Sequence, residues 1–336
     1  MFYIRIIFIV GLMSQLLACS SLLEHKLTQA QGAPMMQPFV LEHIFQQQRF
    51  CHPDSPHSSE PCLRYFDLDV TERIASFASN MELNLDKEGM QLTDQITFSL
   101  KAPPDQAPLA VIFPGYSMHA TDMVFYASWL NDLGFFPIIA DGPTYQTPFD
   151  FGQGYASQLA LALSTRYPDR PVLLLGFSMG ASSLEPFISQ HQKVLGAIAI
   201  APMQDFQATG KAVFERARQR RVLLRLLPEA AIEQALANIL SKSQLTAEQL
   251  NFNHSASRLP TPLLVISGEL DWISPPASLE AGASFTHIQL PYQFHESLLH
   301  PWPEIRQETL RWLESEQLPF QLVHQKSKSS SPATIK

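Results

Sequence analysis

The 336-residue sequence has only three cysteines, and its 23 Lys and Arg residues are outnumbered by 31 Asp and Glu residues. Its formal charge of −8 is spread along the chain and gives no basic patch of the kind that binds nucleic acid, so a polyanionic partner is not expected. Long charged and low-complexity blocks are also missing, whereas 46% of the residues are hydrophobic. These absences favour one large globular domain with insertions.

No long hydrophobic run of membrane-spanning length occurs near the start either. The apolar run from Ile6 to Leu17, preceded by Arg5, is short of the roughly 20 residues that cross a bilayer and has the length of a signal-peptide core. It ends in Leu-Leu-Ala-Cys at positions 16–19, which resembles the lipobox of bacterial lipoproteins. The resemblance implies a signal peptide over residues 1–18 and lipidation of Cys19.

This resemblance also implies a location. Ser20 follows the cysteine where sorted lipoproteins of the inner membrane carry Asp, so we expect an exported lipoprotein held by its N-terminal lipid anchor in the outer membrane, facing the periplasm. An ordinary signal peptide is the alternative.

The other two cysteines, Cys51 and Cys62, bound a loop rich in Pro and Ser within a predicted N-terminal linker over residues 19–65. An oxidising compartment and an even count favour a disulfide, worth about 3 kcal/mol in the loop-entropy model. The loop also contains two His and two acidic residues, so a metal site is an alternative, although the spacing matches no zinc pattern. We therefore expect no metal.

Strand patterns change character along the chain. Residues 73–85 and 90–100 alternate in polarity like antiparallel strands joined by a turn at 87–89. Beyond Pro108 there are five continuous apolar runs, at 109–115, 135–141, 172–178, 194–202 and 262–268. Strands buried on both faces have this pattern, and the amphipathic stretches between them are long enough for crossover helices. The sequence predicts an α/β protein with a mostly parallel central sheet flanked by helices.

Ser178 lies where one predicted strand passes into a helix, within Gly176-Phe-Ser-Met-Gly180. A serine on so sharp a turn leaves no room for side chains two positions before and after it. The motif in this context resembles the nucleophile elbow of the α/β-hydrolase family. The resemblance covers roughly residues 70–318 and implies that fold, with a core over 66–202 and 259–318.

The resemblance further implies an acid and then a histidine downstream. Asp271 follows the strand at 262–268, with Glu269 and Asp205 as rival acids and a simple capping role as another reading. His295 follows the last predicted strand, closer to its end than His300. The family usually has Gly before this histidine, where this chain has Phe294.

Two backbone N–H groups are expected to bind the developing oxyanion. The resemblance points to Met179, directly after the serine, and to Tyr116, in the loop after the strand at 109–115. Gly115 would permit the close approach that this loop needs.

Residues 203–258 exceed what the sheet requires and are predicted to form a small helical cap. Ile232, Leu236 and Ile239 share a helical face that would roof an acyl pocket. Five arginines between positions 216 and 225 either coat a solvated helix or meet anionic groups. Residues 319–336 are predicted to be a disordered tail.

Together these features predict a serine hydrolase of carboxylic esters, with a lipid or other small acyl ester as substrate and no cofactor. A peptidase or thioesterase with the same three residues is the second hypothesis. The third is a non-catalytic surface lipoprotein that keeps the fold as a binding module.

Overall fold

The five apolar runs are all strands in the computed structural model, which describes residues 20–29, 44–51, 62–68, 75–85, 90–279 and 285–320. Every residue of the first three strands and of the fifth is buried. These strands are β5 (Leu109–Phe113), β6 (Phe136–Ala140), β7 (Val172–Phe177), β8 (Val194–Ile200) and β9 (Leu263–Gly268).

Eight of the described strands form one sheet in the order β1-β2-β6-β5-β7-β8-β9-β10. The six strands from β6 to β10 pair in parallel, and β1 and β2 add two antiparallel pairings at one edge. The remaining strands of this sheet are β1 (Phe45–Phe50), β2 (Leu63–Leu68) and β10 (Thr286–Leu290). The α/β prediction with a mostly parallel sheet is therefore confirmed.

The predicted linker over 19–65 is wrong in part, because residues 45–50 form the edge strand β1. This strand has the sequence Phe-Gln-Gln-Gln-Arg-Phe, which lacks the apolar alternation of a half-buried strand, and it pairs on one side only. The predicted core boundary at residue 66 also falls inside β2.

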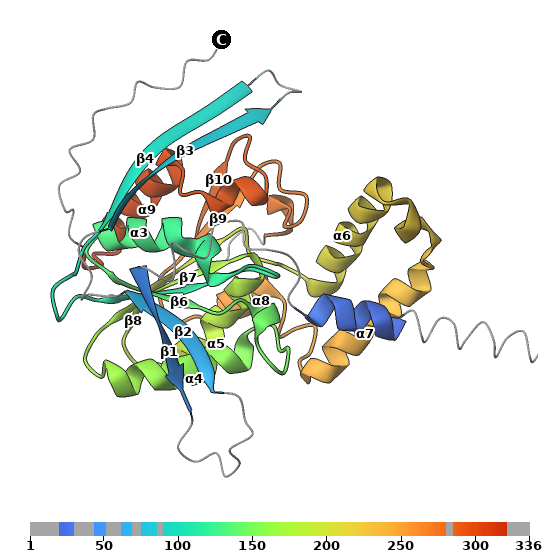
Figure 1. The fold of residues 1–336 in the computed structure, drawn as a ribbon, viewed down its shortest axis with the longest axis horizontal. Coiled ribbons are helices and arrows are strands. Elements are labelled where there is room, and N and C mark those ends of the chain that lie inside the picture. Colours follow the sequence, from blue (N-terminus) through green and yellow to red (C-terminus); the bar gives the residue numbers. More distant parts are fainter. Residues whose placement is uncertain are drawn as a thin grey trace, which may run out of the picture.

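The two alternating segments form the predicted antiparallel hairpin, as β3 (Ala75–Leu85) and β4 (Met90–Leu100). The hairpin is a separate two-stranded sheet rather than part of the main one. It extends beyond the body of the molecule, with its base against α3 (Figure 1).

Helices cover both faces of the main sheet. In Figure 1, α3 and α9 lie on one side and α4 and α5 on the other. Their bounds are α3 (Val124–Asp132), α4 (Gln153–Arg166), α5 (Leu184–Gln190) and α9 (Pro303–Ser315). Short 3-10 turns connect several elements: η1 (Ala120–Met123), η2 (Pro143–Tyr145), η3 (Ser178–Ser183), η5 (Pro276–Ser278) and η6 (Glu296–Leu299).

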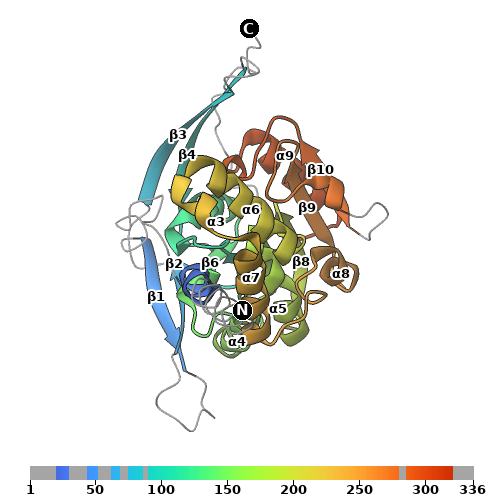
Figure 2. The ribbon, with the colours of Figure 1, turned by 90° about the vertical axis from the view of Figure 1, so that its right-hand side faces the viewer.

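The chain between β8 and β9 is helical. It comprises α6 (Phe206–Arg220), η4 (Val222–Leu226), α7 (Glu229–Ser243) and α8 (Phe252–Ser257). Helices α6 and α7 stand beside the sheet layers (Figures 1 and 2), whereas Phe252 and Ala256 of α8 belong to the main hydrophobic core. The segment that stands apart therefore ends before α8.

Residues 20–28 are also helical and lie beside α7 in both views (blue in Figures 1 and 2). No helix among the described residues is long and apolar enough to span a membrane. Predictions for Cys19, for residues 1–18 and for residues 321–336 lie outside the described part of the chain, as does the alternative metal site within residues 52–61. The sulfurs of Cys51 and Cys62 are joined in a disulfide, with a Cα–Cα distance of 4.4 Å.

Candidate active site

Ser178 sits on a strained turn between β7 and η3. Its φ angle is +52°, a left-handed conformation that residues with a side chain rarely adopt. A Cβ atom at Gly180 would lie 2.2 Å from the carbonyl oxygen of Phe113, and one at Gly176 would lie 2.7 Å from the Cα of Ala181. Both glycines are therefore required for the close packing that holds the serine in this turn.

Three predicted side chains meet in one chain of hydrogen bonds. The Nε2 of His295 is 2.9 Å from the Oγ of Ser178, and its Nδ1 is 2.8 Å from the Oδ2 of Asp271. The Asp271 side chain is fully buried and that of His295 is only 8% exposed. Nδ1 therefore donates to the carboxylate, which leaves Nε2 free to accept a proton from the serine.

Asp271 also caps the turn that follows it. Its Oδ1 accepts hydrogen bonds from the backbone N–H groups of Ile273, at 2.9 Å, and Ser274, at 2.8 Å. The capping role and the contact with His295 thus use different oxygens of one carboxylate. These bonds fix the rotamer that presents Oδ2 to the imidazole.

The two rival acids have other partners. Glu269 accepts a hydrogen bond from the backbone N–H of Tyr292 at 3.3 Å. Asp205 caps α6 by accepting from the N–H of Ala208 at 2.6 Å. Among the acidic residues that the structure describes, only Asp271 is hydrogen-bonded to the His295 ring.

His300 lies apart from the serine and binds the β3–β4 hairpin. Its Nε2 is 2.7 Å from the Oδ2 of Asp94, which also accepts from Arg306 at 3.0 Å. Burial alone would raise the pKa of Asp94, but the hydrogen bonds from His300 and Arg306 outweigh burial and lower it. These contacts join β4 to the segment that carries His295.

The loop after β5 brings Tyr116 to the serine. A Cβ atom at Gly115 would lie 3.0 Å from the sulfur of Met118 and 3.1 Å from the Phe177 ring, so a larger residue there would require these side chains to shift. Met179 follows the serine at the start of η3, where N–H groups have no partner within the helix. Tyr116 and Met179 line the same cavity as Ser178.

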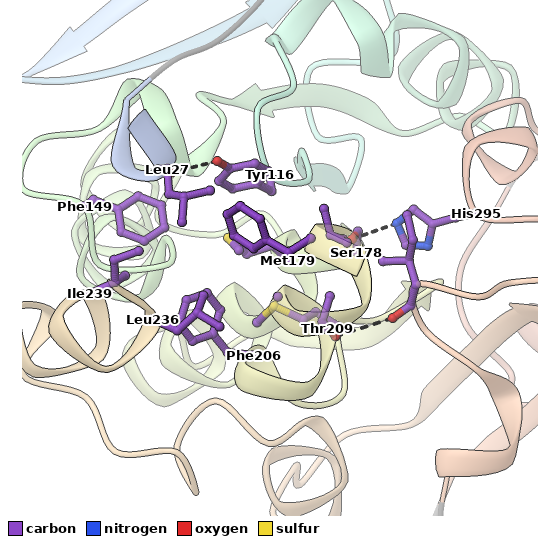
Figure 3. A pocket seen from close by; sticks show the side chains of 15 residues that line it. Leu27, Tyr116, Phe149, Ser178, Met179, Phe206, Thr209, Leu236, Ile239 and His295 are labelled. Carbon is purple, nitrogen blue, oxygen red and sulfur yellow. Dashed lines mark hydrogen bonds between the residues drawn. The ribbon is translucent and has the colours of Figure 1, made fainter. Parts of the chain in front are cut away.

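This cavity has a volume of about 250 Å³ and is largely apolar. Figure 3 shows His295 and Ser178 at one end and Leu27, Phe149 and Ile239 at the other. The lining residues are Leu27, Tyr116, Phe149, Ser178, Met179, Met203, Phe206, Thr209, Gly210, Val213, Phe214, Leu236, Ile239, Ile273 and His295.

The insertion contributes much of this wall, with one difference from prediction. Leu236 and Ile239 of α7 line the cavity. Ile232 does not line it, although it is buried in one cluster with Phe214 and Leu236, which do. Of the predicted helical face, Leu236 and Ile239 line the cavity, whereas Ile232 packs against α6.

Two of the five arginines of the insertion, Arg218 and Arg225, hold its own turn. Arg218 donates to the carbonyl groups of Leu224 and Leu227, and Arg225 donates to the carbonyls of Arg218 and Gln219 at 3.0 Å each. Such bonds satisfy the last carbonyl groups of α6 and of η4. No cluster of three potential metal ligands occurs within the described residues.

Comparisons with known proteins place the fold. No protein-family model and no curated protein matches the chain. Among solved structures, the Pyrococcus furiosus esterase Pf2001 in space group C2221 is 12% identical with a TM-score of 0.57, covering 85% of this chain and 96% of that chain. A second crystal form of that esterase, in space group P212121, gives 12% identity and a TM-score of 0.55, covering 85% and 97%.

An esterase from Thermogutta terrifontis is 16% identical with a TM-score of 0.48, covering 81% of this chain and 99% of that chain. Sequence identities this low support a conclusion about the fold alone. The similarity to the Pf2001 structures shows that the chain has the α/β-hydrolase fold.

Residues 20–28 contribute to the site, although they were not predicted to do so. Leu27 lines the cavity although it lies in the predicted linker. The signal was present in the spacing of Leu23 and Leu27, four positions apart on one helical face. Phe149, in the loop before α4, was missed because a single aromatic in a loop has no periodicity.

Proposed function

We propose that the protein is a serine hydrolase that cleaves carboxylic esters through an acyl-enzyme intermediate. The observation that carries this proposal is the continuous hydrogen-bonded chain from Ser178 through His295 to Asp271, placed at the end of an apolar cavity. A strained serine, an imidazole within hydrogen-bond distance and a buried carboxylate are the parts that acyl transfer needs.

In the first half-reaction, the Ser178 Oγ attacks the carbonyl carbon of the ester while His295 Nε2 takes the hydroxyl proton. The resulting imidazolium is stabilised by Asp271 and then gives its proton to the leaving alcohol as the C–O bond breaks. In the second half, His295 deprotonates a water that attacks the acyl-enzyme. The carboxylic acid leaves and Ser178 recovers its proton.

The backbone N–H groups of Met179 and Tyr116 are assigned to the negative oxygen of each tetrahedral intermediate. Because both donors are backbone N–H groups, they are present whatever side chains these two residues carry. Support comes from the position of both residues in the wall of the cavity that holds Ser178.

The lining of the cavity favours an apolar acyl group. Apart from Ser178, His295, Thr209 and the hydroxyl of Tyr116, its side chains are hydrocarbon, thioether or aromatic. No charged side chain lies among the lining residues to bind an anionic or cationic substrate side chain. A medium-length fatty acyl ester fits these properties better than a peptide.

The test uses the full chain purified in mild detergent with p-nitrophenyl esters of graded chain length, a matched thioester and a p-nitroanilide. We expect ester hydrolysis to exceed thioester and amide hydrolysis, and Ser178→Ala to lose at least about 10³-fold in kcat/KM. Equal turnover by the Ser178→Ala variant would refute the proposal. Faster cleavage of the amide or the thioester by the wild-type chain would favour the peptidase or thioesterase hypothesis. A wild-type chain that cleaves none of these substrates would favour a binding module.

We further propose, from the sequence at positions 16–20, that the mature protein is lipidated on Cys19 and held in the outer membrane, facing the periplasm. The wild-type chain should sediment with membranes and carry the mass of its acyl groups. The Cys19→Ser variant should lack both the sedimentation and the added mass. Cys51→Ser with Cys62→Ser is the matched control, which loses the two disulfide-bonded cysteines but keeps the lipobox. Unchanged mass and sedimentation in Cys19→Ser would contradict this proposal.

A further inference from the structure

Leu27, from the helical segment of residues 20–28 that directly follows Cys19, forms part of the cavity wall. Its side chain lies with Phe149 and Ile239 at the end opposite Ser178 and His295 (Figure 3). The segment thus closes the cavity at the position that the far end of an acyl chain would occupy.

Several contacts hold residues 20–28 in this position. The hydroxyl of Tyr116 donates to the backbone carbonyl of Leu27 at 2.8 Å, directly above the cavity. Burial raises the pKa of Tyr116 to about 12, so the phenol remains a donor at neutral pH. Glu24, with a side chain only 11% exposed, forms an ion pair of 2.5 Å with Lys242 of α7.

Apolar packing supports the same placement. Leu23 and Leu27 pack against the cluster of Phe214, Ile232 and Leu236, which joins α6 to α7. Leu27 also packs against the second cluster, which includes Met179 and Ile239. By contrast, Leu22 on the same segment is 63% exposed and does not line this cavity.

We propose that residues 20–28 complete the acyl-binding site and that Leu27 determines the length of acyl chain that the enzyme accepts. This inference rests on the proposed function for the identity of the acyl group. The wall that limits the length of the acyl chain is then supplied in part by residues 20–28, next to Cys19, and not by the sheet or the α6–α7 insertion alone. A truncated chain that begins after residue 29 would have a cavity open at its far end.

The test compares full-chain Leu27→Trp with full-chain Leu22→Trp, which adds the same bulk at an exposed position of the same segment. Two quantities are measured: the ratio of kcat/KM for octanoyl and acetyl p-nitrophenyl esters, and the affinity for octanoate by calorimetry. Filling the far end removes contacts with several methylene groups, so Leu27→Trp should lower both the ratio and the affinity by about tenfold or more. Leu22→Trp should change neither.

A second variant guards against a misfolded Leu27→Trp chain. Leu27→Ala enlarges the far end and should raise the ratio of dodecanoyl to octanoyl kcat/KM, the direction opposite to that of the bulky residue. The proposal is overturned if the Leu27 variants keep the wild-type length profile and octanoate affinity, or if Leu22→Trp shifts them equally. A chain whose octanoate binding depends on Leu27 but which hydrolyses no ester would support this inference and refute the proposed function.

Discussion

Asp271 holds the imidazole of His295 through Oδ2 at 2.8 Å while its Oδ1 accepts two backbone N–H groups of the turn that follows. The carboxylate is fully buried, so its orientation is fixed by these three bonds rather than by solvent. One short loop after β9 thereby sets both the position and the tautomer of the histidine that faces Ser178.

Replacing this acid by its amide should impair turnover far more than the same change at the rival acids. In Asp271→Asn the amide cannot stabilise the imidazolium and favours the wrong tautomer, so kcat should fall by about 10³-fold to 10⁴-fold with the fold intact. Glu269→Gln and Asp205→Asn should each cost less than about tenfold, because they remove only a loop contact and a helix cap. Steady-state kinetics with a p-nitrophenyl ester measure all three. Equal losses would refute the assignment of Asp271.

His300 should matter for stability and little for chemistry. His300→Ala leaves the buried carboxylate of Asp94 with Arg306 as its remaining recorded side-chain partner, so we expect a loss of about 3 kcal/mol in the free energy of unfolding. His295→Ala should instead lose several orders of magnitude in kcat and keep most of its stability. Urea unfolding and ester turnover of both variants provide the comparison. The opposite ranking would move the general base to His300.

Polar substitutions on α7 should separate cavity residues from packing residues. Leu236→Gln and Ile239→Asn place polar groups in the wall, so they should lower octanoyl turnover more than acetyl turnover. Ile232→Asn, which is buried but does not line the cavity, should destabilise the protein and affect both esters equally. A uniform loss in all three variants would mean that α7 only supports the fold.

Asp132, the last residue of α3, gives a test of pH dependence. Burial raises its pKa to about 6, with the charge of Lys101 working against that rise. Because the folded pKa lies above the ordinary 3.8, the group's contribution to stability is fully present below pH 3.8 and is lost as the pH rises through about 6. Asp132→Asn should therefore be as stable as wild type at pH 4 and more stable at pH 8.

Urea unfolding at both pH values measures this difference. Asp105→Asn, at an exposed position, is the matched control and should show no such divergence. A wild-type chain that gains stability over Asp132→Asn as the pH rises would reverse the predicted sign.

The sequence allowed the buried half of the fold to be predicted because its signals are local. Strands such as β5 and β7 are unbroken apolar runs, and Gly176 and Gly180 mark a turn that only glycine permits. Once Ser178 was assigned to the nucleophile elbow, the expected order along the chain limited the acid and the histidine to a few candidates each. The hydrogen bonds of Glu269 and Asp205 then distinguish the rivals from Asp271.

What could not be predicted depends on contacts between distant segments. The edge strand β1 has a polar sequence, and only its pairing with β2 makes it a strand. Leu27 reaches the cavity because Tyr116 and Lys242, which are far away in the sequence, hold its segment. Whether Ile232 or Ile239 faces the cavity depends on where α6 lies, and a helical period alone does not fix that position.

The reactivity of Ser178 is tested most directly by labelling with a fluorophosphonate and locating the adduct by peptide mass spectrometry. We predict one phosphonyl group per chain, on Ser178, with labelling much slowed in His295→Ala and Asp271→Asn and absent in Ser178→Ala. An adduct on another serine, or no adduct in a folded wild-type chain, would contradict the assignment of Ser178 as the nucleophile.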